Sequence, residues 1–375
     1  MQVIKRDGRI KEFDIERISN AVFKAQKDIY KDKANRLECE LVSELVFDKL
    51  KEENNETVDI EHIQDIVLEV LKSKDLKLYK AYKQCRDERN RQRQKNTELM
   101  RTVNAIGIET DRDNANVGNN FSSKLLRIAS ETNKVNNLNN MPREIAKLHN
   151  KELYYHDLDS YNLTTNCLNI DTGKVLRQGF NTGYGTINPP NRIESASELS
   201  CILLQATQND MFGGQSHVNF DNDMAYFVGL TRDEIIKEYP HHNKDFIEEK
   251  LNQRIHQSMQ GIVYNLNTMH SRAGSQVPFS SLNIGIPKSH DAYLVCKAFL
   301  EEYEKGLGKG EQPIFPNIIF RVKSGVNRNK EDKYYDLFQL ACRVASKRMN
   351  PTFMNLDADF NKEFYDKGII PATMG

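Results

Sequence analysis

Cys167 has the sequence surroundings of a residue that could be chemically active, because amide side chains flank it in the run Asn166-Cys167-Leu168-Asn169. The six cysteines of the chain are scattered without any Cys-x-x-Cys pair, so a cysteine with a chemical role acts alone or with partners distant in sequence. A cysteine in a half-apolar strand is, however, commonly buried and inert. From its neighbours alone, Cys167 fits either description.

Two further segments, residues 209–216 and 269–281, combine glycine, amide and hydroxyl groups directly after helical runs. Such residues let a ligand approach the backbone closely, which is typical of binding loops. Ordinary polar loops have the same composition, so this pattern also leaves two interpretations.

Cations gather near the N-terminus of the chain. Five of them lie close together in sequence: Lys5, Arg6, Arg9, Lys11 and Arg17. Residues 57–61 add a hydroxyl and free backbone amides at an expected helix start, an arrangement that takes phosphate. Together these groups could hold a nucleoside triphosphate. A charged hairpin can also be a solvated β-edge protected against aggregation, and a two-residue turn would place Lys5 and Arg6 on opposite faces.

The elements that must position these cations form an expected α-rich domain. Asp7-Gly8 between two short extended runs predicts a hairpin, since a type I′ turn needs positive φ at both central positions. Asp14 and Asp59 are the expected N-caps of two helices with apolar residues at helical spacing. Further helices are expected through residues 41–50 and from Leu76, the last continuing into a charged linker.

From Asn114 onward the composition shifts to Asn, Ser, Gly, Thr and aromatic residues. Helices are expected at residues 121–133, 142–150, 194–207, 245–269 and 291–306, and strands at 160–169, 280–286 and 317–322. Helices that alternate with single strands indicate crossover connections, and thus a sheet or barrel of α/β type.

The overall charge and hydropathy exclude some classes of protein to which the chain could belong. The 375 residues include 53 Lys+Arg and 53 Asp+Glu, so the formal net charge is zero. This balance argues against a general binder of nucleic acid or of a membrane surface, which needs an excess of one sign. No apolar run reaches membrane-spanning length and no signal-peptide core follows the N-terminus, so we expect a cytoplasmic protein.

Three motifs near the N-terminus occur in a familiar order: Val3-x-Lys5-Arg6-Asp7-Gly8, Phe13-Asp14-x-x-x-Ile18 and Thr57-Val58-Asp59-Ile60. With this spacing, residues 1–92 resemble the ATP-cone, the regulatory domain of ribonucleotide reductases, in which ATP promotes and dATP suppresses activity. Glu61 stands where some members of the family have His. The resemblance implies nucleotide contacts from Lys5, Arg6, Lys11, Glu12, Phe13, Asp14, Arg17, Thr57, Glu61 and Arg86.

The larger part of the chain carries five motifs in sequence. They are His156-Asp157-Leu158, Asn166-Cys167-Leu168-Asn169, Phe212-Gly213-Gly214-Gln215, the long run from His270 to Ser281, and Pro371-Ala372-Thr373-Met374-Gly375. In this order they resemble the catalytic subunit of the anaerobic, class III ribonucleoside-triphosphate reductase, a glycyl radical enzyme. The fold implied is α/β: an α-rich ATP-cone followed by the first half of a barrel built from two parallel half-sheets.

The resemblance also assigns roles. Cys167 matches the second active-site cysteine, whose thiol can protonate the leaving 2′-hydroxyl of the ribose. The residues implied to bind substrate are His156, Asn166, Asn169, Gly214, Gln215, Ser271, Arg272, Ser280 and Ser281. No metal ligand is expected within this chain. An uncharged, water-excluding site of amides and hydroxyls would protect a radical and orient a sugar.

Cofactors and partners follow from the same resemblance. It implies a glycyl radical and a zinc site in a C-terminal part beyond this sequence, formate as reductant, and ATP and dATP as effectors. The expected partners are a ribonucleoside triphosphate substrate, an S-adenosylmethionine iron–sulfur activase, the remaining C-terminal portion of the enzyme and a second copy in a homodimer. Neither nucleic acid nor a membrane is expected as a partner.

In this family the run Ala-Thr-Met-Gly leads directly into the thiyl-radical cysteine, and Gly375 is the last residue here. We therefore expect the N-terminal part of a longer or divided protein, interrupted by a gene break or an intein and inactive alone. Cys296 and Cys342 lie on expected helices outside the required motif and cannot substitute.

The expected domains are the ATP-cone at residues 1–92, a linker at 93–113 and the first half of the catalytic barrel at 114–375. The alternative function is that of a nucleotide-binding regulatory or interaction fragment without catalysis, which activity on mixing with a C-terminal fragment would distinguish. A transcriptional repressor that bears a cone has a zinc ribbon before it, whereas this sequence starts at the hairpin.

Overall fold

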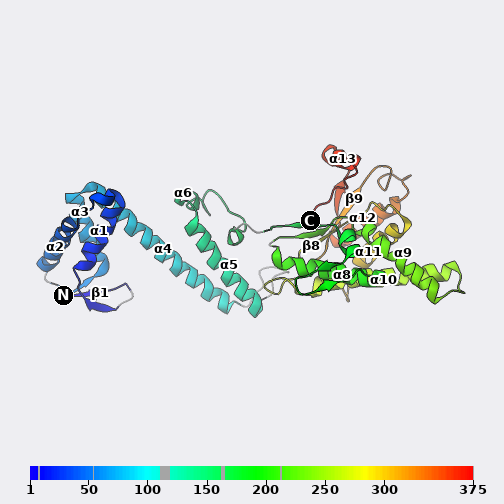
Figure 1. Ribbon diagram of the computed structural model, residues 1–375, viewed down its shortest axis with the longest axis horizontal. Helices are drawn as coiled ribbons and strands as arrows, with labels where there is room; N and C mark the ends of the chain where they lie inside the picture. The colour runs from blue at the N-terminus through cyan, green and yellow to red at the C-terminus, as the bar shows by residue number, and fades with distance from the viewer. Residues whose placement is uncertain (7–8, 54, 110–118, 162–164, 212, 375) are drawn as a thin grey trace. The chain divides into compact units, whose positions relative to one another are not determined.

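The computed structural model describes residues 1–6, 9–53, 55–109, 119–161, 165–211 and 213–374 (Figure 1). The chain divides into two compact units, Met1–Thr102 and Val103–Gly375. Each unit has a hydrophobic core of its own.

The first unit combines a small sheet with helices. Strand β1 (Gln2–Ile4) pairs antiparallel with β2 (Ile10–Glu12) and parallel with β3 (Thr57–Asp59). The helices are α1 (Glu16–Tyr30), α2 (Arg36–Glu52), α3 (Ile60–Lys74) and α4 (Leu76–Ile108), with the short 3₁₀ helix η1 (Lys31–Lys33) between α1 and α2. The predicted hairpin is confirmed in its strands, and its Asp7-Gly8 turn lies outside the described residues.

Helix starts in this unit follow the predicted caps with one correction. Asp59 caps α3 as expected and accepts a hydrogen bond from the Glu61 amide at 2.7 Å. Asp14 is not the N-cap of α1, because Ile15 occupies that position. The Asp14 carboxylate still accepts from the Glu16 amide at 3.1 Å, since an aspartate side chain readily bonds the amide two residues on.

Most of the expected linker is helical, because α4 continues to Ile108. The charged stretch needs no apolar partner to remain helical, since Arg and Glu have high helix propensity and pair along the helix. Arg91 and Glu88 show such a pair, with an Nη2 to Oε1 distance of 2.7 Å.

The second unit is built on a parallel sheet of five strands in the order β10-β9-β8-β7-β4. The strands are β4 (Leu168–Ile170), β7 (Gln215–His217), β8 (Ser280–Ile284), β9 (Asn317–Val322) and β10 (Thr352–Asn355). Because each new strand is added to the same edge, right-handed crossovers place the connecting helices on one face of the sheet (Figure 1).

The helices along this sheet are α7 (Thr172–Gln178), α8 (Ile193–Thr207), α9 (Phe220–Glu238), α10 (Lys244–Thr268), α11 (His290–Lys305) and α12 (Tyr335–Arg348). The unit also contains α5 (Phe121–Asn140), α6 (Arg143–Ala146), α13 (Asp359–Asp366), the 3₁₀ helices η2 (Leu158–Ser160) and η3 (Gln208–Asp210), and the two-stranded pair β5 (Phe180–Asn181) and β6 (Thr186–Ile187). None of the described helices combines the length and the apolar character that a bilayer crossing requires.

The two faces of the sheet differ in chemistry. Leu282 and Ile284 of β8 and Phe320 of β9 belong to the large core shared with the helices. Side chains alternate along a strand, so Ser281 and Asn283 project from the opposite face. We call this opposite face the inner face of the sheet.

Several predicted elements are confirmed within one or two residues, among them α8, α10, α11, β8 and β9. The helix expected at 142–150 is reduced to Arg143–Ala146. Of the strand expected at 160–169, residues 162–164 lie outside the described residues, and strand β4 is found at Leu168–Ile170.

Helices α7, α9, α12 and α13 and strands β5, β6, β7 and β10 were missed. Strand β7 consists of three buried polar residues and so lacks an apolar signal. Helix α9 has buried apolar residues at helical spacing, Phe220, Met224, Phe227 and Val228, and the sequence could have revealed it.

Candidate active site and nucleotide site

Four polar residues lie side by side on the inner face of the sheet. The strand register aligns Asn169 with Ser216, Ser216 with Ser281, and Ser281 with Asn317. Residues aligned across parallel strands project from the same face, so adjacent strands contribute one uncharged group each. We call Asn169, Ser216, Ser281 and Asn317 the polar row.

Cys167 lies at one end of this row, directly before β4, and is exposed. Its thiol points toward Asn166 Oδ1 at 3.7 Å. The Gly213 amide donates to the Asn166 carbonyl at 2.6 Å, and the Leu168 amide donates to the Gly214 carbonyl at 3.2 Å. A β-carbon on Gly213 would lie 2.8 Å from the Cys167 sulfur, so only glycine allows this close approach.

Arg272 belongs to a closed loop before β8. Its amide donates to the Gln276 carbonyl at 3.1 Å, and the Gln276 amide donates back at 3.3 Å. The guanidinium lies 4.3 Å from the centre of the Phe279 ring. Burial lowers the pKa of Arg272, with Asp157 opposing, yet an arginine stays charged. The side chain lines a hollow of about 490 Å³ together with Ser130 and Asn133.

Gln208 joins the Cys167 loop to the Arg272 loop. This buried side chain donates through Nε2 to the Gly213 carbonyl at 3.3 Å and accepts through Oε1 from the Phe279 amide at 3.1 Å. Gln208, Ser216, Asn283 and Asn317 were not among the residues predicted from the sequence. The alternation of polar residues in Ser281-Leu282-Asn283-Ile284 is the signal that marks a polar sheet face.

The structure brings some of the predicted substrate residues together and separates others. Asn169 and Ser281 lie in the polar row, and Asn166 and Gly214 lie beside Cys167. The Gln215 side chain points instead to the helix layer, where it accepts from the Thr207 hydroxyl.

Three more predicted substrate residues lie apart from the polar row. Ser280 alternates with Ser281 and so faces the helix layer as well. His156 has an 81% exposed side chain, with Nε2 at 2.8 Å from the Asp157 carboxylate. The Ser271 hydroxyl is buried, and the structure shows no hydrogen-bond partner for it among the described residues.

The predicted nucleotide contacts of the first unit fall into two groups. Lys5, Lys11 and Arg17 form the first, in which burial and then the charges of Arg17 and Lys11 lower the pKa of Lys5. Asp14 accepts a hydrogen bond from Arg17 Nε at 3.1 Å and partly balances this cluster. Three of the remaining predicted contacts lie on the adjoining elements: Glu12 ends β2, Phe13 stacks on Phe47 at 5.2 Å, and Thr57 is exposed in β3.

Arg6, Glu61 and Arg86 form the second group. The Glu61 carboxylate accepts from Arg6 Nε and from Arg86 Nη2, the latter at 2.8 Å, while Asp65 binds Arg86 Nη1 at 2.6 Å. Burial raises the pKa of Glu61, but the two guanidinium groups outweigh it and lower the pKa overall. A small hollow of about 90 Å³ opens here, lined by Arg6, Lys24, Tyr82, Arg86 and Arg89 among others.

Within the described ranges, no group of three or more His, Cys, Asp or Glu side chains is arranged to hold a metal ion. The groups on the inner face and at its Cys167 end are a thiol, amides and hydroxyls, with the half-buried guanidinium of Arg272 nearby. Such a surface can orient an uncharged sugar by hydrogen bonds and exchange a proton at Cys167.

Two family models match the chain. The model described as "ATP cone domain" matches residues 1–91, and the model described as "Anaerobic ribonucleoside-triphosphate reductase" matches residues 113–374. The anaerobic ribonucleoside-triphosphate reductase of Haemophilus influenzae is 29% identical over 373 residues, which cover 95% of this chain and 52% of the relative. The Escherichia coli protein of the same name is 30% identical over 370 residues, covering 95% and 51%.

A solved structure named "Anaerobic ribonucleotide reductase" is similar in fold, with a TM-score of 0.51 at 15% identity over 72% of this chain and 46% of that one. The predicted fold class, an ATP-cone followed by an α/β half of a glycyl-radical-type barrel, is thereby confirmed. The chain spans about half the length of the curated relatives it matches.

Proposed function

The chain belongs to the anaerobic ribonucleoside-triphosphate reductase family, and we propose that it contributes the regulatory domain and the first half of the active site to the reduction of ribonucleoside triphosphates to deoxyribonucleoside triphosphates. In this proposal residues 1–92 are the ATP-cone, residues 93–113 the linker and residues 114–375 the first half of the barrel. The observation that carries it is the polar row with Cys167 at its end.

Cys167 is proposed to act as the proton donor to the leaving 2′-hydroxyl. Its thiol proton is directed at Asn166 Oδ1, a neutral acceptor that orients the thiol without removing its proton. Asn169, the exposed member of the polar row nearest Cys167, would bind the ribose through its side-chain amide, which supplies both a donor and an acceptor, whereas Ser216 is buried and bonds the Thr373 carbonyl. Arg272, at the same end of the sheet, is suited to a phosphate or carboxylate.

The inner face fits a radical reaction because the side chains of its polar row are uncharged. A glycyl radical would supply the one-electron oxidation that starts the reaction, and formate the reducing equivalents. The chain's own residues bind the sugar and deliver the proton at Cys167 Sγ.

The ATP-cone is proposed to bind ATP and dATP through the cations of its two groups. The further partners are an S-adenosylmethionine iron–sulfur activase, a polypeptide that supplies the other half of the barrel, and a second copy of the chain. We propose a cytoplasmic location and no binding of nucleic acid.

A reconstitution experiment with two polypeptides tests the catalytic proposal directly. The purified chain is combined with a polypeptide corresponding to the second half of the relatives, an activase, formate and a ribonucleoside triphosphate under anaerobic conditions. We expect deoxyribonucleotide only when both halves are present. A mixture that forms the glycyl radical but no deoxyribonucleotide would contradict the catalytic role and favour the alternative, a nucleotide-binding regulatory fragment.

A further inference from the structure

The side-chain amide of Asn283 forms hydrogen bonds with the backbone of Thr373, close to the end of the chain. It lies on the inner face in β8 and is fully buried. Its Oδ1 accepts from the Thr373 amide at 3.0 Å, and its Nδ2 donates to the Thr373 carbonyl at 2.9 Å. One side chain therefore satisfies both backbone polar groups of Thr373, as a neighbouring strand would.

Ser216 of the polar row completes this contact. Its hydroxyl donates to the Thr373 carbonyl at 3.1 Å and accepts from Asn283 Nδ2 at 2.7 Å. Asn283 Nδ2 also lies 3.3 Å from the His217 carbonyl. Because these neighbours are acceptors, they determine which way the amide is turned and leave Oδ1 for the Thr373 amide.

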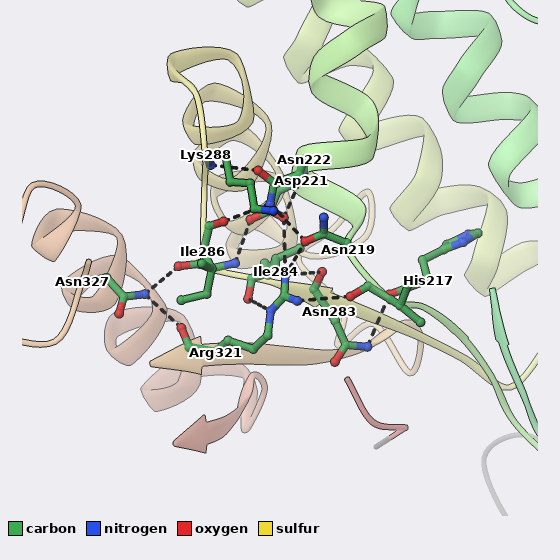
Figure 2. A network of polar contacts seen from close by, with 12 residues as sticks. His217, Asn219, Asp221, Asn222, Asn283, Ile284, Ile286, Lys288, Arg321 and Asn327 are labelled. Carbon is green, nitrogen blue, oxygen red and sulfur yellow. Dashed lines mark hydrogen bonds and ion pairs between the residues drawn. The ribbon is translucent and has the colours of Figure 1, made fainter. Parts of the chain in front are cut away.

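A buried guanidinium supports the backbone that carries Asn283 (Figure 2). Arg321 is fully buried and donates to the carbonyls of Asn283 at 3.4 Å, Ile284 at 3.3 Å and Val218 at 3.2 Å. It also lies 3.6 Å from the Asp221 carboxylate. A buried guanidinium is not hydrated and therefore needs hydrogen-bond acceptors in the protein. The carbonyls around Arg321 supply them, and this network fixes the backbone from which the Asn283 side chain projects.

The contact at Thr373 determines where Met374 lies. The Met374 sulfur is 3.7 Å from the β-carbon position of Gly214, and the preceding glycine, Gly213, packs against Cys167. The segment 371–374 therefore lies over β7 and β8 on the inner face, with Met374 next to the Cys167 loop.

We propose that Asn283 is a positioning residue for the reaction: it docks segment 371–374 on the inner face, so that Met374 lies against Gly214 beside the Cys167 loop. This inference rests on the proposed function, in which that run leads to the reacting cysteine. Asn283 touches no reacting atom in this role and acts through the backbone of Thr373.

Hydrogen exchange on the 375-residue chain tests the docking without nucleotide or radical. In Asn283→Ala, the Thr373 amide and the neighbouring amides of Ala372 and Met374 should exchange about tenfold faster, the effect of losing roughly one net hydrogen bond. Asn327→Ala is the matched control, because Asn327 is equally buried and donates to the Gly285 and Arg321 carbonyls. Unchanged exchange in Asn283→Ala, or equal acceleration in Asn327→Ala, would overturn the proposal.

A second pair of variants changes Thr373 and leaves the buried residues of the sheet unaltered. Thr373→Pro removes the backbone N–H that Asn283 accepts, whereas Thr373→Ala keeps both backbone groups. We expect Thr373→Pro to release Ala372 and Met374 as Asn283→Ala does, and Thr373→Ala to exchange like the wild type. Equal release in both Thr373 variants would show that the hydroxyl, and not the amide pair, holds the segment.

Steady-state kinetics of the reconstituted enzyme test the positioning role. Asn283→Ala should lower kcat about tenfold or more while KM and the yield of glycyl radical stay unchanged, since misplacing a reacting group slows chemistry without loosening substrate. An unaltered kcat would overturn the role. A wild-type mixture without activity would instead refute the proposed function, and the exchange experiments would still decide whether Asn283 docks the segment.

Discussion

Gly213 stands so close to Cys167 that a β-carbon added to it would lie 2.8 Å from the cysteine sulfur. The same β-carbon would lie 2.8 Å from the Asn166 carbonyl oxygen, which cannot swing away as a side chain can. The Cys167 thiol can therefore occupy this position only because residue 213 is a glycine, which has no side chain.

Gly213→Ala is therefore expected to destabilise the second unit by about 1–3 kcal/mol, the usual cost of an overpacked contact. Urea unfolding followed by circular dichroism measures the change. Gly229→Ala is the control, because nothing lies within 4 Å of its β-carbon position in α9 and alanine favours a helix. Equal stability of the two variants would contradict the close contact at Cys167.

Cys167→Ser should abolish product formation in the reconstituted enzyme, by at least about 100-fold, because a hydroxyl is a far weaker acid than a thiol. The electron paramagnetic resonance signal of the glycyl radical should remain. Cys342→Ser, at an exposed position in α12, serves as the control and should keep wild-type turnover. Retained turnover in Cys167→Ser would refute the proton-donor role.

Glu61→Gln is expected to strengthen ATP and dATP binding by about three- to tenfold. In the structure Glu61 neutralises Arg6 and Arg86, so nucleotide phosphates must compete with its carboxylate for the same cations. Calorimetric titration of the chain measures the affinities. Glu69→Gln on the same helix removes an equal charge that pairs with Lys49 and should leave them unchanged. Weaker binding in Glu61→Gln would instead make Glu61 a direct nucleotide contact.

Asp223→Asn should stabilise the chain at neutral pH but not in acid. Burial raises the pKa of Asp223 to about 6, and the charges of Asp171 and Asp221 add to this, while the Gly173 amide and Arg177 oppose it. The unfolded chain loses this proton near pH 4, so wild-type stability falls as the pH rises from about 4 to 6. Asparagine stays neutral throughout.

The advantage of Asp223→Asn should therefore grow to about 2–3 kcal/mol at pH 7 and vanish near pH 4, since each pKa unit corresponds to about 1.4 kcal/mol. Urea unfolding at both pH values measures it. Asp233→Asn, exposed on the same helix, should show no such dependence. A constant difference between pH 4 and 7 would mean that Asp223 titrates normally.

Local patterns in the sequence were sufficient for the hairpin, for the cap at Asp59, and for helices with a regular apolar stripe such as α8 and α10. These features depend on neighbours within one or two turns of chain, which the sequence displays directly. The family and its fold class also followed from the order of short motifs.

The tertiary structure alone decided which polar residues meet. Asn169, Ser216, Ser281 and Asn317 are far apart in sequence and share a row only because the strand register aligns them. The same alternation turned Gln215 and Ser280 toward the helices, although they adjoin members of the row. Register depends on long-range packing of the whole sheet, so a one-residue difference reverses the face without changing any local motif.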